Sequence, residues 1–448
     1  MSAPAAYRTR VLTGWGRTAP SRAKVAGPLA AGPLQELVAG GLAGGVLARG
    51  AGLSYGDAAQ NAGGCVLAPV TWPSVELAAD AASVRASASA TFAAVLARIV
   101  PRGRILPVLP GTRNLTVGGA IAADVHGKNQ RADGSISAWI EEIELIDGRG
   151  ELRRVTPDGD AETFRATVGG MGLTGVILAA TIRLLPIRSG LLQVSSRRAP
   201  DLDALLSGLD GARGRYTVGW IDTTAAGRSL GRGIVEAGDH LAGPDPAEAG
   251  GPVYRPGPAR RAPAVPFCPV TPLSARAFNS LWFRKAAEHR SEITGLAAFF
   301  HRLDAVTGWN RTLGPRGFVQ YQFAVPYGAE SVITEVLEAV QRERCAPFLG
   351  TLKRFGRPGA GHLSFPVPGW SVAIDMPAGN PRLAPLLDRL DARVAAAGGR
   401  VYLAKDGRLG AEAFGAMYPD LPRWQAAREK LDPAGTFRSD LGRRVGLC

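Results

Sequence analysis

The chain has 448 residues, more than one hydrophobic core normally serves, so its length predicts two domains. Hydrophobic residues make up 46% and the 58 Gly and 33 Pro follow no period, which excludes collagen-like and low-complexity material. The net charge is +14, but the densest basic spots are Arg pairs, so the sequence disfavours nucleic-acid binding and favours a phosphate-bearing substrate or a membrane surface.

The cysteine spacing and the hydropathy pattern argue against further classes of protein. The four Cys residues are far apart and form no metal-ligand spacing, so we expect neither a disulfide framework nor a metal site. The N-terminus has no apolar signal-peptide core, and no run of eighteen apolar residues occurs. We therefore expect a cytoplasmic or membrane-associated protein without a signal peptide or transmembrane segment, and leave a peripheral membrane association open.

Three Gly-rich loops lie within the first 190 residues. An apolar strand from Val46 leads into the first loop, RGAGLSYG, whose Gly residues make it a candidate phosphate cradle. It is not a Rossmann fingerprint, because no helical period follows, and it is not a P-loop, because the Gly-Lys-Ser/Thr ending is missing. The elements expected between this loop and the third one are a helix at Thr91–Ile99, a strand at Ile105–Pro110, a hairpin of Ile140–Ile146 with Glu151–Val155, and a helix at Asp158–Thr167.

The second loop, TVGGAIAADVHGKN from Thr116 to Asn129, combines a Gly pair, small residues and a His-Gly-Lys triplet. Gly118 and Gly119 would let a phosphate or a flat ring approach backbone N–H groups. Taken alone, the pattern is as typical of a tight bend as of a ligand site. The third loop, TVGGMG, precedes a long buried strand that ends near Ile187.

The amino-acid composition and the hydrophobic pattern change after Pro186. Residues 238–266 are rich in Gly and Pro and are expected to form a flexible surface loop, a composition that is also typical of lids over binding sites. The alternation in GFVQYQFAVP predicts a strand with Gln320 and Gln322 on one face. The remaining expected elements are strands at Arg215–Thr223, around Lys353 and at Ser371–Pro377, and helices at Ser331–Gln341 and Leu383–Ala397; the alternation suits an antiparallel sheet covered by helices.

The motifs ARGAGLSYGDAAQN, PGTRNLTVGGAIAADVHGKN, ATVGGMGLTGVI, GFVQYQF, LSFPVPGW and YLAKDGR occur in this order over about 360 residues. Together they resemble the FAD-dependent oxidases of the vanillyl-alcohol-oxidase (PCMH-type) fold, and within them the decaprenylphosphoryl-β-D-ribose 2'-oxidase family of actinobacteria. The resemblance implies an α+β flavoprotein with an FAD-binding domain at 1–189, a substrate domain with a helix-covered antiparallel sheet at 190–398, and a segment at 399–448 that returns to the FAD-binding domain.

The resemblance also implies bound FAD. A His in the first loop carries the flavin covalently in many relatives, but Leu53 stands there, so we expect non-covalent FAD. The residues that match flavin-contacting positions are Arg49, Gly50, Ala51, Gly52, Leu53, Ser54, Tyr55, Gly56, Gly111, Thr116, Val117, Gly118, Gly119, Ala123, His126, Ile177 and Tyr402.

Catalysis in the family removes a hydride from C2 of the sugar while a polar group takes the hydroxyl proton. Lys405 is the expected base, because a desolvated Lys can have a lowered pKa, as Arg cannot. Tyr55, His126 and Gln322 are expected beside it. The expected substrate-binding residues are Lys128, Trp220, Phe283, Gln320, Gln322, Lys353, Ser371, Ala373 and Lys405, with Lys128 and Lys353 assigned to the phosphate.

The departures from the family pattern lie on the substrate side. Ser371 and Ala373 stand where Asn and Cys are usual, Phe283 where Tyr is common, and Val218 replaces a polar residue. The expected function is oxidation of the 2'-hydroxyl of a phosphorylated or polyprenyl-phosphoryl ribose, with a companion short-chain reductase completing an epimerisation to arabinose for cell-wall arabinan. The alternatives are a paralogous oxidoreductase for another sugar-like alcohol in secondary metabolism and, less favoured, a non-catalytic basic binding protein.

Overall fold

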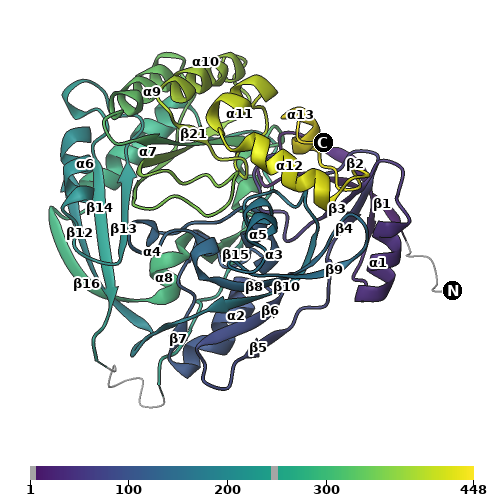
Figure 1. Ribbon diagram of the computed structural model, residues 1–448. Coiled ribbons are helices and arrows are strands. Elements are labelled where there is room, and N and C mark those ends of the chain that lie inside the picture. Colours follow the sequence, from purple (N-terminus) through teal and green to yellow (C-terminus); the bar gives the residue numbers. More distant parts are fainter. Residues whose placement is uncertain (1–6, 244–250) are drawn as a thin grey trace.

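A computed structural model describes residues 7–243 and 251–448 of the chain, in which helices pack on mostly antiparallel sheets, as in an α+β fold (Figure 1). Two sheets form the first part. One has the strand order β1-β2-β4-β3, and the other has the order β5-β6-β10-β8-β9. Their bounds are β1 (Arg8–Leu12), β2 (Ser21–Ala26), β3 (Val46–Ala48), β4 (Cys65–Leu67), β5 (Val75–Leu77), β6 (Ser83–Ser87), β8 (Ile140–Ile146), β9 (Leu152–Val155) and β10 (Val176–Arg183).

Five short helices belong to this part of the chain: α1 (Ala31–Ala39), α2 (Phe92–Ile99), α3 (Val117–Ala122), α4 (Gln130–Asp133) and α5 (Ala161–Thr167). Helices α2, α3 and α5 contact the two sheets, whereas α4 contacts the large sheet described below. Thr91 and Asp160 begin α2 and α5 as N-caps, because their side-chain oxygens accept a backbone N–H three residues on. The expected hairpin of β8 and β9 and both expected helices are therefore confirmed, with the helix starts moved to their caps.

One expected strand is wrong. Only Arg104–Ile105 (β7) is a strand, paired with β11 (Leu185–Pro186), whereas residues 106–110 are irregular. Pro107 and Pro110 explain the difference, because each removes a backbone donor that a strand ladder would need. Leu109 and Pro110 instead line the large cavity described below.

The second part is built on a large sheet with the order β16-β12-β14-β13-β19-β20-β18-β21. Helix α6 (Leu202–Asp210) packs against β13 and β14, while α9 (Ser331–Arg342) and α10 (Leu383–Ala396) cover the other end of the sheet (Figure 1). The strands are β12 (Leu191–Ala199), β13 (Tyr216–Ile221), β14 (Gly233–His240), β16 (His289–Gly295), β18 (Phe318–Pro326), β19 (Leu349–Phe355), β20 (Gly369–Pro377) and β21 (Arg400–Val401).

The segment expected as a loop is only partly irregular. Strand β14 continues to His240, and β15 (Arg260–Arg261) pairs in parallel with β17 (Val306–Thr307). Residues 244–250 lie outside the described part, so the loop as a whole stays a prediction. The helices α7 (Pro272–Lys285) and α8 (Leu296–Phe300) follow, and α7 escaped prediction because its apolar residues do not form a core-facing stripe.

The C-terminal residues return to the first part of the chain. The backbone N–H of Val46 donates to the carbonyl of Thr436, and the buried Trp424 indole donates to the Ala166 carbonyl. Figure 1 shows α12 (Leu421–Leu431) and α13 (Asp440–Arg444), in yellow, beside the purple strands β2 and β3, with α11 (Ala411–Met417) above them. This return brings the YLAKD motif against the first Gly-rich loop.

Candidate active site

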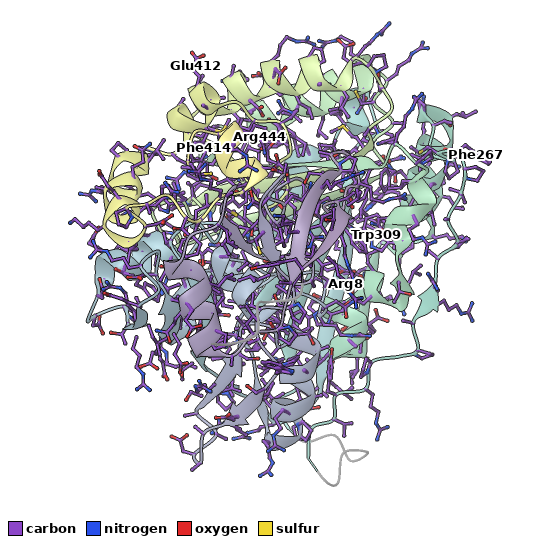
Figure 2. The ribbon with its side chains drawn as sticks, turned by 90° about the vertical axis from the view of Figure 1, so that its right-hand side faces the viewer. Arg8, Phe267, Trp309, Glu412, Phe414 and Arg444 are labelled. Carbon is purple, nitrogen blue, oxygen red and sulfur yellow. The ribbon has the colours of Figure 1, made fainter. Side chains whose placement is uncertain are left out.

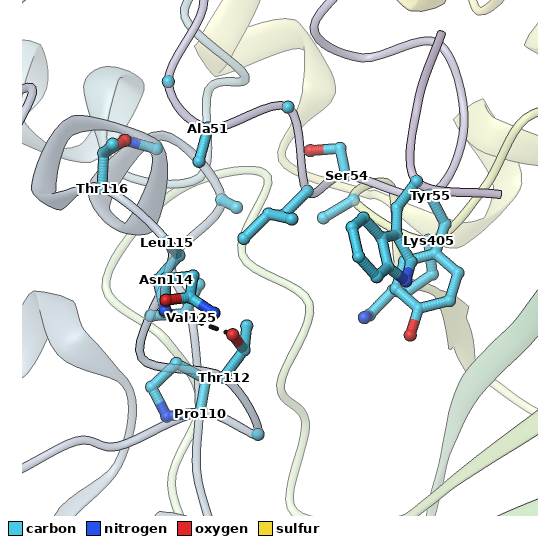
Figure 3. Close-up of a pocket in the computed structure, with 18 of the residues that line it drawn as sticks. Ala51, Ser54, Tyr55, Pro110, Thr112, Asn114, Leu115, Thr116, Val125 and Lys405 are labelled. Atoms are coloured by element: carbon cyan, nitrogen blue, oxygen red, sulfur yellow. Dashed lines mark hydrogen bonds between the residues drawn. The ribbon is translucent and has the colours of Figure 1, made fainter. Parts of the chain in front are cut away.

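A cavity of about 630 Å³ lies between the Gly-rich loops and the large sheet. Figure 3 shows the two sides that face each other across it: the segment from Pro110 to Thr116 on one side, and Tyr55 with Lys405 on the other. Ala51 and Ser54 lie between these sides. The size is in the range of sites that bind a cofactor or a drug-sized ligand.

The first Gly-rich loop offers unused backbone donors to this cavity. Arg49 N–H bonds to the Leu67 carbonyl and Tyr55 N–H to the Ala404 carbonyl, which fixes the two ends of the loop. Between them, the N–H groups of residues 50–54 have no acceptor among the described residues, although all five residues line the cavity. Such a run of convergent N–H groups is a cradle for an anion such as a pyrophosphate.

Gly52 is required in this loop by its backbone. Its φ is +68°, a conformation that L side chains rarely adopt, and a Cβ there would collide with the Arg49 guanidinium. That guanidinium is fixed by hydrogen bonds to the carbonyls of Ala59 and Thr13, at 2.7 and 2.8 Å. The loop geometry therefore depends on Arg49 and Gly52 together.

The second loop contributes differently from its expected role. The N–H of Gly118 donates to the Ala88 carbonyl at 2.9 Å, and that of Gly119 donates to the Thr116 hydroxyl at 3.3 Å, so neither is free for a phosphate. A Cβ on Gly118 would stand 2.8 Å from the Ala88 Cβ. Gly118 instead permits close approach of α3 to the segment at Ala88.

Small residues make one part of the cavity a narrow slot. The slot is lined by Ala88, Gly118, Gly119, Ala122, Ala123 and Gly172. Tyr402 fixes its end, because its hydroxyl donates to the Ala123 carbonyl at 2.8 Å. A slot without bulky side chains next to a cradle of free N–H groups fits a flat ring system joined to a pyrophosphate, so these residues fit FAD.

The register of the large sheet places the polar candidates on one face. Directly opposite residues of neighbouring antiparallel strands share a face, and Gln320 lies opposite Asp375. One cross-strand row of this face consists of Gln322, Ala373, Thr351, Trp220, Ile234 and Arg198. The face therefore runs without interruption from the cavity floor to β12, the strand next to the edge strand β16.

Lys405 lies at the end of this floor, above the ring of Tyr55. Its Nζ is 3.7 Å from the ring centroid, and Figure 3 shows the two side chains against each other. Burial lowers the pKa of Lys405, the charge of Lys353 lowers it further, and the carboxylate of Asp375 opposes both. Removal from water thus favours the neutral amine, the form that accepts a proton.

Asp375 is held beside this pair. Gln320 Nε2 donates to Asp375 Oδ1 at 2.7 Å and reaches the Tyr55 hydroxyl at 3.4 Å. Burial raises the pKa of Asp375, while the Gln320 hydrogen bond and Lys405 lower it. Burial also raises the pKa of Tyr55, with a further contribution from Asp375. Tyr55 therefore stays protonated, whereas burial favours the neutral forms of both Lys405 and Asp375.

His126 lies on the opposite side of the floor. Its Nε2 is 3.0 Å from Gln322 Nε2, its ring is surrounded by Phe355, Phe365 and Tyr402, and its Nδ1 is buried without a partner among the described residues. Burial first, and then the charges of Lys353 and Lys405, lower the pKa of His126 well below its ordinary value. The imidazole is therefore neutral, and because Gln322 Nε2 is a donor, His126 Nε2 accepts and Nδ1 carries the hydrogen.

Lys353 and Lys128 differ in their charge partners. Burial lowers the pKa of Lys353 to about 8, and within the described residues its ammonium has neither an ion pair nor a hydrogen bond. Lys128 Nζ instead donates to the Phe299 carbonyl at 2.8 Å and lies 3.5 Å from Glu236, and burial lowers its pKa to about 8. Among the three lysines that line this cavity, Lys353 is therefore the one near which the described residues place no acidic group.

Five of the expected site residues do not line the cavity. Gly56 packs on the Asp406 carbonyl, Val117 is buried in the core of the first part, and Ser371 lies behind Gln322, to which its hydroxyl is hydrogen-bonded at 3.3 Å. Trp220 lies on the cavity face of the sheet but further out, and Phe283 is on α7 between Arg198 and Arg232. The other expected residues are brought together around the cavity.

Three residues that line or support the cavity were not predicted from the sequence. Asp375 was assigned only to a buried strand, SVAID, and not to the site. In the sheet it lies directly opposite Gln320, which the alternation of its own strand had placed at the site. Asp304 was not identified because it is far along the chain from the residues that it contacts. Its carboxylate accepts from the Thr112 hydroxyl at 2.7 Å and from the Arg113 N–H at 2.8 Å, and these hydrogen bonds fix the cavity wall. Arg444 bridges Asp57 and Asp406, so it fastens the first loop to the segment that carries Lys405. Figure 2 shows it among the yellow C-terminal helices.

Comparisons with known proteins agree with this geometry. The FAD binding domain family matches residues 42–156, and the D-arabinono-1,4-lactone oxidase family matches residues 372–445. The chain is 37% identical to decaprenylphosphoryl-β-D-ribose oxidase of Mycolicibacterium smegmatis, over 98% of each chain. It is 40% identical to an uncharacterised protein of Streptomyces coelicolor over 78% of this chain and 98% of that one, and 35% identical to D-arabinono-1,4-lactone oxidase of Eremothecium gossypii over 19% and 16%.

The fold, the cradle and these matches define an FAD-dependent oxidoreductase with a PCMH-type FAD-binding domain. Within that class the match over nearly the full length of both proteins is decisive. The chain belongs to the decaprenylphosphoryl-β-D-ribose oxidase family. No helix within the described residues is long and apolar enough to cross a membrane.

Proposed function

We propose that this protein oxidises the 2'-hydroxyl of a polyprenyl-phosphoryl ribose to the 2'-keto sugar. The observation that carries the proposal is the position of Lys405: a deeply placed amine with a lowered pKa, on the floor of a cavity whose other end fits FAD. Bound FAD supplies the hydride acceptor. The full-length relative from Mycolicibacterium smegmatis is named for a decaprenylphosphoryl ribose, which supports the same substrate class here.

Lys405 accepts the hydroxyl proton in this proposal. Its amine lies next to Tyr55 and within the field of Asp375, so the proton it takes is held close to a carboxylate. Gln322 and the neutral His126 would hold the sugar by hydrogen bonds, because neither adds charge to the floor. Gln320 keeps Asp375 and the Tyr55 hydroxyl in fixed positions.

Lys353 is the residue that we assign to the phosphate. Its ammonium faces the cavity without a counter-charge among the described residues, and a phosphate would supply one. Lys128 would support this site less directly, since Glu236 and the Phe299 carbonyl already engage it. Trp220 and Phe283 lie on the route outward from the cavity and would contact the lipid-linked part of the substrate.

The FAD is proposed to be non-covalent. Leu53 lines the cavity in the first loop, where a covalent link would require a His or another nucleophile. The proposed division into a cofactor domain of residues 1–189 and 399–448 and a substrate domain of residues 190–398 is supported by the contacts of Trp424 and Arg444 with the first part. Strand β21, which joins the large sheet, lies at the border.

A companion short-chain reductase would reduce the keto group from the opposite face and so complete an epimerisation to arabinose for cell-wall arabinan. Oxidation alone leaves a keto sugar, so a hydride-donating partner enzyme is chemically required for that outcome. Association with a membrane surface, where a polyprenyl-phosphoryl sugar resides, is part of the same proposal.

One specific observation favours a second candidate, the oxidation of a related sugar-like alcohol. Ala373 lines the cavity opposite Gln322, and Val218 lines it as well, so the floor carries two apolar side chains where the family pattern has a Cys and a polar residue. A substrate with fewer polar groups on that side would bind there as well as the pentose does. This candidate has the same FAD chemistry and the same proton acceptor.

An anaerobic flavin-reduction screen separates the two candidates. The purified yellow enzyme is mixed without oxygen with polyprenyl-phosphoryl ribose, ribose 5-phosphate, free ribose or a nucleoside, and the loss of flavin absorbance is followed. The proposal expects the polyprenyl-phosphoryl sugar to give the fastest bleaching. Faster bleaching by an unphosphorylated alcohol would favour the second candidate, and bleaching by none of them would contradict both.

A further inference from the structure

Helix α7 turns its apolar side chains outward. The exposed fractions of Leu273, Phe278, Leu281 and Trp282 are 79%, 54%, 53% and 46%. A surface helix of a globular protein normally buries its apolar stripe. Here the inward side is formed by Ala275, Asn279 and Phe283, four residues apart, so the larger apolar side chains have no place in the core.

The same helix carries positive charge without acidic residues. Arg276, Arg284 and Lys285 are exposed, and within the described residues none of them forms an ion pair. The flanking chain adds to this excess, because residues 260–293 contain six Arg or Lys and two Glu. One of those Glu residues, Glu292, is already paired with Arg290. We call Leu273, Phe278, Leu281 and Trp282 together with Arg276, Arg284 and Lys285 the α7 face.

The α7 face lies at the outer end of the cavity floor. Phe283 anchors the helix between two guanidinium groups, those of Arg232 at 4.6 Å and Arg198 at 5.6 Å from the ring centroid. Arg198 ends the cross-strand row that begins at Gln322 in the cavity. Figure 1 shows α7 beside β13 and β14, the strands that carry the middle of this row.

A second connection runs along the cavity rim. The segment before α7 pairs with the rim, because Arg260–Arg261 lie in register with Val306 and Thr307, which line the cavity. Phe267, also exposed, follows on this segment, and Figure 2 shows it at the edge of the molecule, directed away from the body. Cavity rim and α7 are therefore parts of one continuous region of the chain.

We propose that the α7 face docks the protein onto an anionic lipid membrane, with the cavity rim toward the bilayer. Aromatic and Leu side chains together with Arg and Lys on one short helix are typical of helices that lie in the membrane interface. Basic residues close to an anionic lipid surface add a favourable electrostatic contribution to binding. A second copy of the chain is a poorer occupant, since two such faces would bring like charges together. The inference deepens the membrane association included in the proposed function, on which it rests, by naming the surface that docks and the class of lipid that it meets; docking itself needs neither substrate nor turnover.

Vesicle co-sedimentation of the FAD-loaded enzyme tests the proposal. Wild type is compared on vesicles of phosphatidylglycerol with phosphatidylcholine and on vesicles of phosphatidylcholine alone. The apolar variant F278S/L281S/W282S should bind the anionic vesicles about tenfold more weakly or worse. The charge variant R276E/R284E/K285E should lose the preference for anionic lipid. The controls W72S and K430E change exposed residues elsewhere on the surface and should bind as wild type does.

A second measurement distinguishes failure of the docking proposal from failure of the proposed function. Flavin reduction by a detergent-dispersed polyprenyl-phosphoryl ribose should proceed in the α7 variants as in wild type, and unchanged flavin content shows that they fold. Failure of wild type to bind anionic vesicles, or equal binding by the apolar variant, would overturn the docking proposal even if every protein oxidises the sugar. Self-association of wild type that the apolar variant abolishes, without vesicle binding, would assign the face to a second copy and overturn it too.

Discussion

Replacing Lys353 with Met should make the folded protein more stable and the substrate bind less well. Met keeps the length and the apolar stem of the side chain but removes the ammonium. Burial lowers the pKa of Lys353 from 10.5 to about 8, and among the described residues no acidic side chain pairs with it. At about 1.36 kcal/mol for each pKa unit, the buried ammonium costs the fold up to about 3 kcal/mol at neutral pH.

The sign of the pH dependence follows from proton binding. Between pH 8 and about 10.5 the unfolded chain binds more protons at Lys353 than the folded chain does, so wild-type stability rises with pH in this window. The advantage of the Met variant is therefore complete below pH 8 and disappears above about 10.5. Thermal unfolding of the FAD-saturated proteins at pH 7 and pH 9.5 measures it, with K430M, a change at an exposed Lys, as the control.

Substrate affinity should change in the opposite direction. If Lys353 holds the phosphate, loss of a charge-assisted contact should raise the substrate concentration for half-maximal flavin reduction by about tenfold or more, with a smaller effect on unphosphorylated ribose. A variant that unfolds at a lower temperature than wild type at pH 7, or that binds the phosphorylated sugar unchanged, would refute the reasoning about this residue.

Three further predictions concern the cofactor and the proton acceptor. Gly52→Ala should lose FAD, because the φ of +68° and the Arg49 guanidinium both exclude a Cβ. The control Gly41→Ala, at φ +64° with open space around it, should keep the flavin. Equal flavin content in the two purified variants would contradict the role of the first Gly-rich loop as the cofactor cradle. Acid or heat denaturation should release all the flavin into the supernatant, and flavin that sediments with the protein would show a covalent bond. Asp375→Asn should shift the pH profile of flavin reduction to lower pH, since it removes the carboxylate that raises the pKa of Lys405; an unmoved profile would separate Asp375 from proton transfer.

Local sequence rules predicted the parts of this fold that local interactions determine. The β8–β9 hairpin, the helices α2 and α5, and the alternation that puts Gln320 and Gln322 on one face all depend on neighbouring residues. The strand expected at Ile105–Pro110 was wrong because Pro107 and Pro110 remove backbone donors that a strand ladder would need, although the apolar residues between them are buried as in a strand. Helix α7 was missed for a different reason: its apolar side chains face outward, so no core-facing period marks it.

The candidate site was predictable where motifs carry it and not where distant segments meet. Lys405, His126 and the first Gly-rich loop lie within recognisable motifs. Asp304 and Arg444 act through contacts across 192 and 387 residues, which no local pattern encodes. The role of Gly118 and Gly119 also required the structure, because only the positions of Ala88 and Thr116 show that their N–H groups are already used.

The central claim is that Lys405 takes the proton while polyprenyl-phosphoryl ribose reduces the bound FAD. Its most direct test is anaerobic stopped-flow reduction of the flavin in wild type and in Lys405→Met, with K430M as the matched control. Loss of a general base typically slows such a step by about 10²- to 10⁴-fold, so the Met variant should stay yellow with substrate while wild type and K430M are bleached. Bleaching of the Lys405→Met enzyme at the wild-type rate would contradict the claim.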